Sequence, residues 1–174
     1  MNFGVAVIAA VVGYVFGAIS FSRLVARFVS PETDPDKIVI TDEQTGETFQ
    51  RPAGAATVSM SLGWKVGCLV SVLDILKVAL PVLAVKLLWP GENYFLVTAV
   101  SGVVGHNWPV FYRFKGGSGI SAIYGGLLVI DPLAVVAPMI GGLLVGLVIL
   151  RSFAVMFLLS LLLIIPWLWF RFHN

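Results

Sequence analysis

The stretch that decides the fold is Gly105-His-Asn-Trp-Pro-Val-Phe-Tyr-Arg-Phe-Lys-Gly-Gly-Ser-Gly119, a polar segment between long apolar runs. It brings His106, Arg113 and Lys115 together with a cluster of glycines. Charged side chains are rare in the hydrocarbon core of a membrane because their burial there is costly. The segment is therefore expected to join two membrane-spanning helices at the level of the lipid headgroups.

The composition of the whole chain is typical of an integral membrane protein. Charged residues make up 11% of the 174 residues and apolar residues 59%, whereas a soluble domain has about 25% charged residues. The mean hydropathy is +0.99, and runs of about 20 apolar residues are long enough to cross a bilayer as helices. The sequence predicts an all-α, polytopic membrane helix bundle of five to seven spans, built from residues 3–21, 67–89, 94–111, 120–150 and 152–170.

A hydrophilic segment follows the first apolar run. We expect a single integral membrane domain over residues 1–174, with an extended cytoplasmic loop at 29–66. Within that loop, β-prone runs at 37–41 and 47–51 flank a turn-forming stretch, which favours a small β-hairpin. Residues 53–59 are small and are expected to form an interfacial or re-entrant loop.

Basic residues in short loops indicate the orientation of the spans. Arg23, Arg27 and Lys65 lie on one side, and Arg113 and Lys115 return to it after two further spans. That side is expected to be cytoplasmic, which places the N-terminus outside. The first apolar run has no basic region before it and is expected to be a retained helix. A net charge of +2 without a basic block argues against nucleic-acid binding.

The glycine-rich end of the opening segment has two interpretations. Consecutive glycines can point backbone N–H groups at one anion, and nearby cations would strengthen the binding of a phosphate. The alternative is a flexible turn with ordinary cytoplasmic cations. The spacing is not that of a P-loop. The candidate phosphate-binding residues here are Arg113, Lys115, Gly116, Gly117, Ser118 and Gly119, and His106 is the candidate for proton transfer.

Two further features lie within the apolar runs. Asp74 and Lys77 are three residues apart and share one helix face, so they are predicted to form a structural ion pair, with substrate contact as the alternative. The same charges leave a channel or transporter as a third functional class, although no inverted repeat is evident. Gly13 and Gly17 are four residues apart and are expected to let another helix approach closely.

Other candidate ligands are scattered along the chain. Arg51, Gly54 and Thr57 from the small-residue loop, and His173 near the end, are candidates for phosphate binding, each weighed against an ordinary solvated or packing role. Cys68 stands alone in an apolar run, so no Cys/His metal site is expected. The acidic residues between 32 and 47 are expected to form a solvated surface and not a metal site.

The order Gly105-His-x-x-Pro-Val-Phe-x-x-Phe-Lys-Gly-Gly-x-Gly119 resembles the signature of bacterial acyl-phosphate:glycerol-3-phosphate acyltransferases of the PlsY type. Supporting matches are Gly13-Tyr-x-x-Gly17 before Leu24-Val-Ala-Arg27, and Leu62-Gly-x-Lys-x-Gly67 before Leu73-Asp-Ile-Leu-Lys77. The resemblance implies a bacterial inner-membrane enzyme without a metal or other cofactor. It would move a fatty acyl group from acyl phosphate to glycerol 3-phosphate, or a similar phosphorylated acceptor, and make lysophosphatidic acid for phospholipid biosynthesis.

The sequence also departs from the pattern of that family. Gln50, Thr57 and Met60 stand where the family loop has serine, asparagine and arginine, and Ser118 replaces a lysine. Arg51 could replace the missing arginine from a shifted position. These departures keep an alternative open, namely a non-catalytic relative that binds a lipid phosphate or a partner protein in the membrane.

Overall fold

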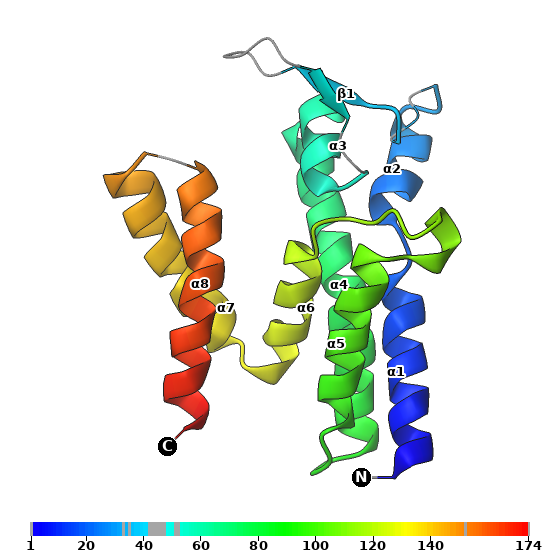
Figure 1. Ribbon diagram of the computed structural model, residues 1–174, viewed down its shortest axis with the longest axis vertical. Helices are drawn as coiled ribbons and strands as arrows, with labels where there is room; N and C mark the ends of the chain where they lie inside the picture. The colour runs from blue at the N-terminus through cyan, green and yellow to red at the C-terminus, as the bar shows by residue number, and fades with distance from the viewer. Residues whose placement is uncertain are drawn as a thin grey trace. The chain divides into compact units, whose positions relative to one another are not determined.

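The computed structural model describes residues 2–32, 34, 36–41, 48–50, 53–151 and 153–173. The chain forms two compact units, Met1–Gly126 and Leu127–Asn174. In chain order the elements are α1 (Phe3–Gly17), α2 (Phe21–Val29), β1 (Val39–Thr41), β2 (Thr48–Gln50), α3 (Ala55–Leu62), α4 (Trp64–Leu88), α5 (Tyr94–Asn107), η1 (Val110–Tyr112), α6 (Ile120–Ile130), α7 (Leu133–Gly142), a π-helix η2 (Leu143–Ile149) and α8 (Phe153–Phe172) (Figure 1). The expectation of a single membrane domain stays a prediction.

Helices α1, α4 and α5 run side by side and form the core of unit 1 (Figure 1). Glycines allow α1 and α5 to touch along their backbones. A Cβ added at Gly13 or Gly17 would come closer than 3.0 Å to the backbone of Thr98 or Gly102, and one at Gly105 would meet the backbone of Tyr14. The close helix approach predicted from Gly13 and Gly17 is therefore confirmed, and it uses the packing of small residues that is common in membranes.

This contact leads to a stability prediction for Gly13→Ala. The new methyl group cannot fit against the backbone of Thr98, so α1 and α5 must separate at a cost of about 1–3 kcal/mol. We expect a fall in Tm of several degrees, measured on the detergent-purified protein. Gly4→Ala is the matched control on the same helix, because its nearest neighbour is a side-chain oxygen of Asn2 at 3.3 Å. An equal Tm for both variants would contradict the packing role.

The first apolar run is interrupted before its expected end. The predicted span over residues 3–21 lies within a stretch that is long and apolar enough to cross a membrane, but its helix is interrupted, because α1 ends at Gly17 and α2 begins at Phe21. The intervening Ala18-Ile19-Ser20 leaves the helical path, and the carbonyl of Ile19 accepts a bond from a side chain of α4. Broken helices in membranes are tolerated where side chains satisfy the freed backbone groups. This break brings backbone and hydroxyl groups into the interior of unit 1.

The hydrophilic segment has more helix than the sequence suggests. β1 and β2 pair antiparallel, with Ile40 opposite Phe49, so the predicted hairpin pairing is present; the expected turn at 42–46 lies outside the described residues. The predicted loop at 53–59 is wrong, because Gly54 instead precedes the helix α3. Alanine favours helix strongly, and helix packing against α4 and α2 supplies the remaining stability.

The outer faces of the helices in unit 1 are apolar. Exposed aliphatic side chains follow α1 and α4, including Val7, Ile8, Val11, Val72, Leu76, Leu80 and Leu83. Among the described residues, the stretches Phe3–Val29 and Trp64–Leu88 are long and apolar enough to cross a membrane. Shorter apolar helices cover Ile120–Ile130, Leu133–Gly146 and Leu158–Phe172. Such exposed apolar surface suits contact with lipid.

The long apolar run at 120–150 breaks at one of its three expected positions. Gly125 and Gly126 lie inside α6, where Gly125 packs against the backbone of Ile75. The break falls at Asp131-Pro132 between α6 and α7. In unit 2, Asp131 accepts hydrogen bonds from the Leu133 N–H and the Trp167 indole, each at 3.1 Å. Gly141-Gly142 marks the passage from α7 into the π-helix.

Candidate functional site

A polar pocket lies in unit 1, at the end of the bundle where α1 gives way to α2. Its walls come from the α1–α2 break, α4, the C-terminal end of α5 and the glycine segment. The lining residues that carry polar side chains are Ser20, Ser22, Arg23, Asp74, Lys77 and His106. Four of these, Arg23, Asp74, Lys77 and His106, carry ionisable groups. Ionisable residues within or beside membrane-spanning helices mark a functional site by default.

Asp74 and Lys77 form a buried ion pair on α4. The Lys77 Nζ lies 2.8 Å from Asp74 Oδ1, and these side chains are 3% and 4% exposed. Lys77 also donates to the carbonyl of Ile19 at 2.5 Å. The break between α1 and α2 therefore supplies an acceptor for the ammonium group. Because both side chains also line the pocket, this pair is available for substrate contact as well as for structure.

His106 lies beside this pair with hydrogen-bonding capacity left over. Its Nδ1 is 3.9 Å from Asp74 Oδ1. Asp74 Oδ1 is paired with Lys77, whereas His106 Nδ1 and the Oδ1 of Asn107 are buried and have no hydrogen-bond partner among the described residues. Buried polar atoms without partners are rare in native proteins and call for an explanation such as a bound group. A hydroxyl or a phosphate in the pocket would supply a partner for the His106 imidazole, which lines it.

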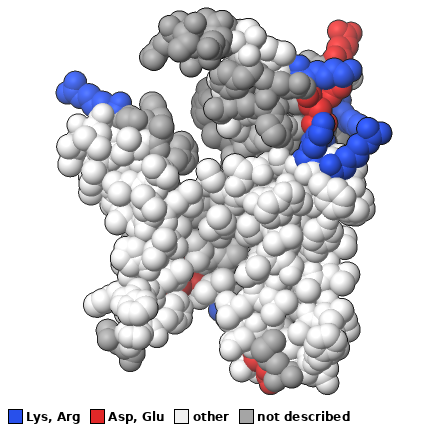
Figure 2. Space-filling model, in the orientation of Figure 1, with Lys and Arg blue, Asp and Glu red and all other residues white. Residues whose placement is uncertain are grey.

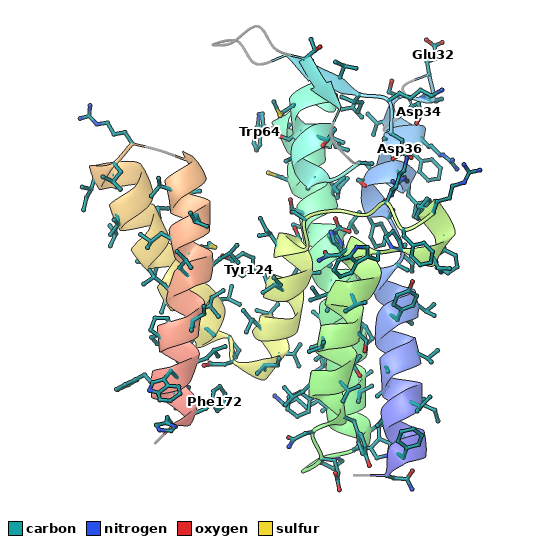
Figure 3. All side chains as sticks on the ribbon, in the orientation of Figure 1. Glu32, Asp34, Asp36, Trp64, Tyr124 and Phe172 are labelled. Carbon is teal, nitrogen blue, oxygen red and sulfur yellow. The ribbon has the colours of Figure 1, made fainter. Side chains whose placement is uncertain are left out.

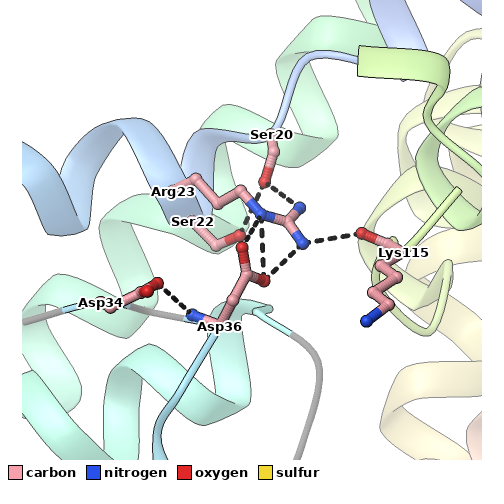
Figure 4. A network of polar contacts seen from close by, with 6 residues as sticks. All are labelled: Ser20, Ser22, Arg23, Asp34, Asp36 and Lys115. Atoms are coloured by element: carbon pink, nitrogen blue, oxygen red, sulfur yellow. Dashed lines mark hydrogen bonds and ion pairs between the residues drawn. The ribbon is translucent and has the colours of Figure 1, made fainter. Parts of the chain in front are cut away.

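Arg23 lines the pocket from α2, and its guanidinium group has several hydrogen-bond partners (Figure 4). Nε and Nη2 donate to the Asp36 carboxylate at 2.9 and 2.6 Å. Nη1 donates to Ser20 Oγ at 3.1 Å, and Nη2 also donates to the Lys115 carbonyl at 2.7 Å. The Tyr112 ring lies 4.4 Å from the guanidinium carbon. The side chain of Arg23 is only 4% exposed.

The glycine segment, residues 116–119, crosses the end of α5 and packs against His106. The Gly117 N–H donates to the His106 carbonyl at 3.2 Å, so it is not directed at an anion in this conformation. A Cβ on Gly117 would collide with His106 Nε2, and one on Gly116 would collide with carbonyl oxygens of α5. Gly119 has φ +84 and lies against the Asn107 amide. Glycine is therefore required here for close packing that positions the imidazole.

The other predicted site residues have varied surroundings. Arg113, Lys115 and Ser118 are exposed, and Lys115 reaches the pocket network through its carbonyl. Thr57 is buried in α3, Gly54 precedes that helix, and Arg51 lies outside the described residues. His173 belongs to unit 2, where its ring stacks on Trp169 at 4.2 Å. Their roles in phosphate binding stay predictions.

The sequence marks Ser20-Phe-Ser-Arg23 as a polar cluster at the membrane edge, where a lipid-like substrate would be met, but it does not single out Arg23, Ser20 or Ser22 as individual ligands. Arg23 follows an apolar run and is most simply interpreted as a cytoplasmic anchor. The available signal was the cluster Ser20-Phe-Ser-Arg23 at the end of a span, because three polar groups on one helical turn are unusual at membrane depth. Among the described residues, no three His, Cys, Asp or Glu side chains gather as a metal site would require.

Comparison with known proteins identifies the family. The model of the glycerol-3-phosphate acyltransferase family matches residues 7–173. The chain belongs to this family. A glycerol-3-phosphate acyltransferase from Oceanobacillus iheyensis is 32% identical over 133 residues, which are 72% of this chain and 58% of that protein. One from Myxococcus xanthus is 35% identical over 126 residues, or 72% of this chain and 60% of that protein. The chain thus spans about 60% of the length of these relatives.

Solved structures of the family share the fold. The glycerol 3-phosphate form of PlsY, an integral membrane glycerol 3-phosphate acyltransferase, matches with a TM-score of 0.77 at 24% identity over 96% of this chain and 78% of that one. The lysophosphatidic acid form matches with a TM-score of 0.64 at 23% identity over 92% and 86% of the two chains. The all-α membrane helix bundle predicted from the sequence is therefore confirmed.

Proposed function

We propose that this glycerol-3-phosphate acyltransferase family member transfers a fatty acyl group from acyl phosphate to glycerol 3-phosphate. The products are lysophosphatidic acid and inorganic phosphate, the first for phospholipid biosynthesis. The relatives are named glycerol-3-phosphate acyltransferases, and PlsY has solved forms with glycerol 3-phosphate and lysophosphatidic acid. The membrane lipid phase accepts the acylated product, and no metal or other cofactor takes part.

The observation that carries the proposal is the buried pocket with two cations and His106. Arg23 and Lys77 place positive charge where a phosphate would enter, and both are held by consecutive residues, Ser20 and Ile19, of the α1–α2 break. Arginine binds phosphate oxygens bidentately, and lysine adds a point charge. A site that holds the phosphate of the acceptor fixes its hydroxyl against the acyl donor, and such positioning lowers a barrier by about 7–11 kcal/mol.

The chemical step is an acyl transfer between two oxygens. The hydroxyl oxygen of glycerol 3-phosphate attacks the acyl carbon, and the bond from that carbon to the phosphate oxygen breaks. The phosphate leaves with the electron pair. His106, whose Nδ1 has no hydrogen-bond partner in the described part of the chain, accepts the hydroxyl proton and returns it to the departing phosphate. Histidine suits this role because it accepts and returns protons near neutral pH.

We place the pocket on the cytoplasmic side of the bacterial cytoplasmic membrane, with the N-terminus outside and residues 29–66 in the cytoplasm. Lys and Arg side chains gather with Glu32, Asp34 and Asp36 at the end of unit 1 that carries the hairpin (Figures 2 and 3). Basic residues concentrate in cytoplasmic loops. Cytoplasmic access also suits water-soluble glycerol 3-phosphate, which would enter the pocket from this polar end.

The proposal is tested by reconstitution. Vesicles with the purified chain receive palmitoyl phosphate and radiolabelled glycerol 3-phosphate, and labelled lysophosphatidic acid is measured. We expect product well above that from protein-free vesicles and from vesicles with the double variant Asp74→Asn/Lys77→Met, which lacks the buried charges. No product above these controls would contradict the enzyme. Acyl phosphate binding without product would support the non-catalytic relative instead.

A further inference from the structure

The segment between α2 and α3 contacts the pocket or its lining residues at two places. Its carboxylate at Asp36 binds Arg23, and its far end at Ala53 lines the pocket itself. Met60, where the family pattern has arginine, is 61% exposed and adds no cation. Among the described residues that line the pocket, the cation on this side is Arg23. Lys77 reaches the pocket from α4.

The contacts of Arg23 divide into two kinds. Ser20 Oγ, the Lys115 carbonyl and the Tyr112 ring hold the guanidinium in place without any negative charge. The anionic partner is Asp36, whose side chain is 45% exposed although that of Arg23 is 4% exposed. A fork of two nitrogens on two carboxylate oxygens is also the geometry with which arginine grips a phosphate.

Charge balance makes the Asp36 carboxylate the replaceable partner. Arg23 and Lys77 carry two positive charges, and Asp74 and Asp36 offset them. Asp74 is buried on α4, so it cannot leave the site. Asp36 lies on the exposed segment before β1, and its departure would leave one net positive charge facing the pocket. The negative charge of an incoming phosphate would offset this positive charge, and its oxygens would accept hydrogen bonds from the same two guanidinium nitrogens.

We propose that Arg23 binds the phosphate of the substrate, and that the Asp36 carboxylate occupies this phosphate position until a phosphomonoester enters. This inference rests on the proposed function and adds that Asp36 competes with the substrate phosphate for Arg23. Asp36 keeps the guanidinium paired in the substrate-free protein, where an unpaired buried charge would be costly. Substrate binding then releases the start of the hairpin segment, which couples occupancy of the pocket to the position of residues 36–41.

The test compares two neighbouring carboxylates. Asp34→Asn is the matched control. Asp34 accepts a hydrogen bond from the Asp36 N–H at 3.0 Å, and this bond is the main cause that lowers the pKa of Asp34 and keeps it charged. The amide oxygen of an asparagine can accept the same hydrogen bond. Dissociation constants for glycerol 3-phosphate and for inorganic phosphate are measured by calorimetry on the full chain in nanodiscs. We expect Asp36→Asn to bind both ligands about tenfold more tightly than wild type, the scale of one charge-assisted hydrogen bond. Asp34→Asn should bind them as wild type does.

Two further variants separate competition from a structural role. Arg23→Gln should weaken binding about tenfold or more, and Asp36→Asn added to Arg23→Gln should give no gain. A gain in the Arg23→Gln background, or equal affinities for Asp36→Asn and Asp34→Asn, would overturn the inference while leaving the proposed function intact. Absence of ligand binding and of product in wild type and all variants would count against the proposed function itself.

A wild-type measurement covers the case in which Asp36→Asn does not fold. Hydrogen exchange of the amides in residues 36–41 is compared with and without saturating glycerol 3-phosphate. Displacement of Asp36 should speed this exchange, whereas exchange in α4 should stay unchanged or slow. Unchanged or slower exchange in residues 36–41 on saturation would overturn the proposal.

Discussion

Replacing Lys77 with methionine is expected to lower kcat/KM for acyl transfer by about 10- to 100-fold, the range for the loss of one charge-assisted hydrogen bond to a phosphate. The same change leaves Asp74 as an uncompensated buried charge, because its ion-pair partner at 2.8 Å is gone. Breaking a buried pair in this way costs about 3–5 kcal/mol of stability. The measurements are initial rates in vesicles and the Tm of the purified protein.

A double variant separates these two effects. In Asp74→Asn/Lys77→Met neither charge remains, and replacing a whole buried pair is often neutral for stability. We expect its Tm to recover toward wild type while its activity stays at the level of Lys77→Met. Recovery of activity together with stability would mean that the pair is structural and that Lys77 does not contact the substrate.

Replacing His106 with glutamine is expected to lower kcat by about 10²- to 10⁴-fold, the range for removal of a general base. Glutamine retains hydrogen-bonding groups and similar reach but cannot carry the proton of the attacking hydroxyl. KM for glycerol 3-phosphate should change little, because the phosphate is held by Arg23 and Lys77. Steady-state rates with varied glycerol 3-phosphate separate the two parameters.

Two comparisons check that assignment. Trp108→Leu is the control from the same region, since its exposed ring lies two residues further on and its carbonyl still accepts from Tyr14; it should retain wild-type kcat. Gly117→Ala should resemble His106→Gln, because the new methyl group would displace the imidazole. A normal kcat in His106→Gln would remove His106 from the chemistry.

Much of the fold was predictable from composition and local pattern. Long apolar runs require helices in lipid, because every backbone group must find its partner within the segment. The small residues Gly13 and Gly17 indicated close helix packing, and the structure supplies α5 as the partner. The boundaries were less predictable. The α1–α2 break and α3 depend on tertiary contacts with α4 that no local pattern encodes.

The candidate site was only partly predictable for a related reason. His106 and the glycines stand out because they interrupt an apolar sequence. Arg23 does not, since an arginine after a span is the ordinary pattern. Its place in the pocket depends on Ser20, Asp36 and the Lys115 carbonyl, and the last of these is 92 residues away along the chain.

Hydropathy and motif order were enough to identify a helical membrane protein with the glycine-rich signature of its family, because both are local properties of the chain. The tertiary structure decided which charges share one pocket. Burial of an arginine, a lysine and a histidine together depends on where distant helices and loops supply acceptors, here the carbonyl of Ile19 and the carboxylates of Asp74 and Asp36. That pairing is an electrostatic requirement of the packed state, and it exists only when the helices have come together.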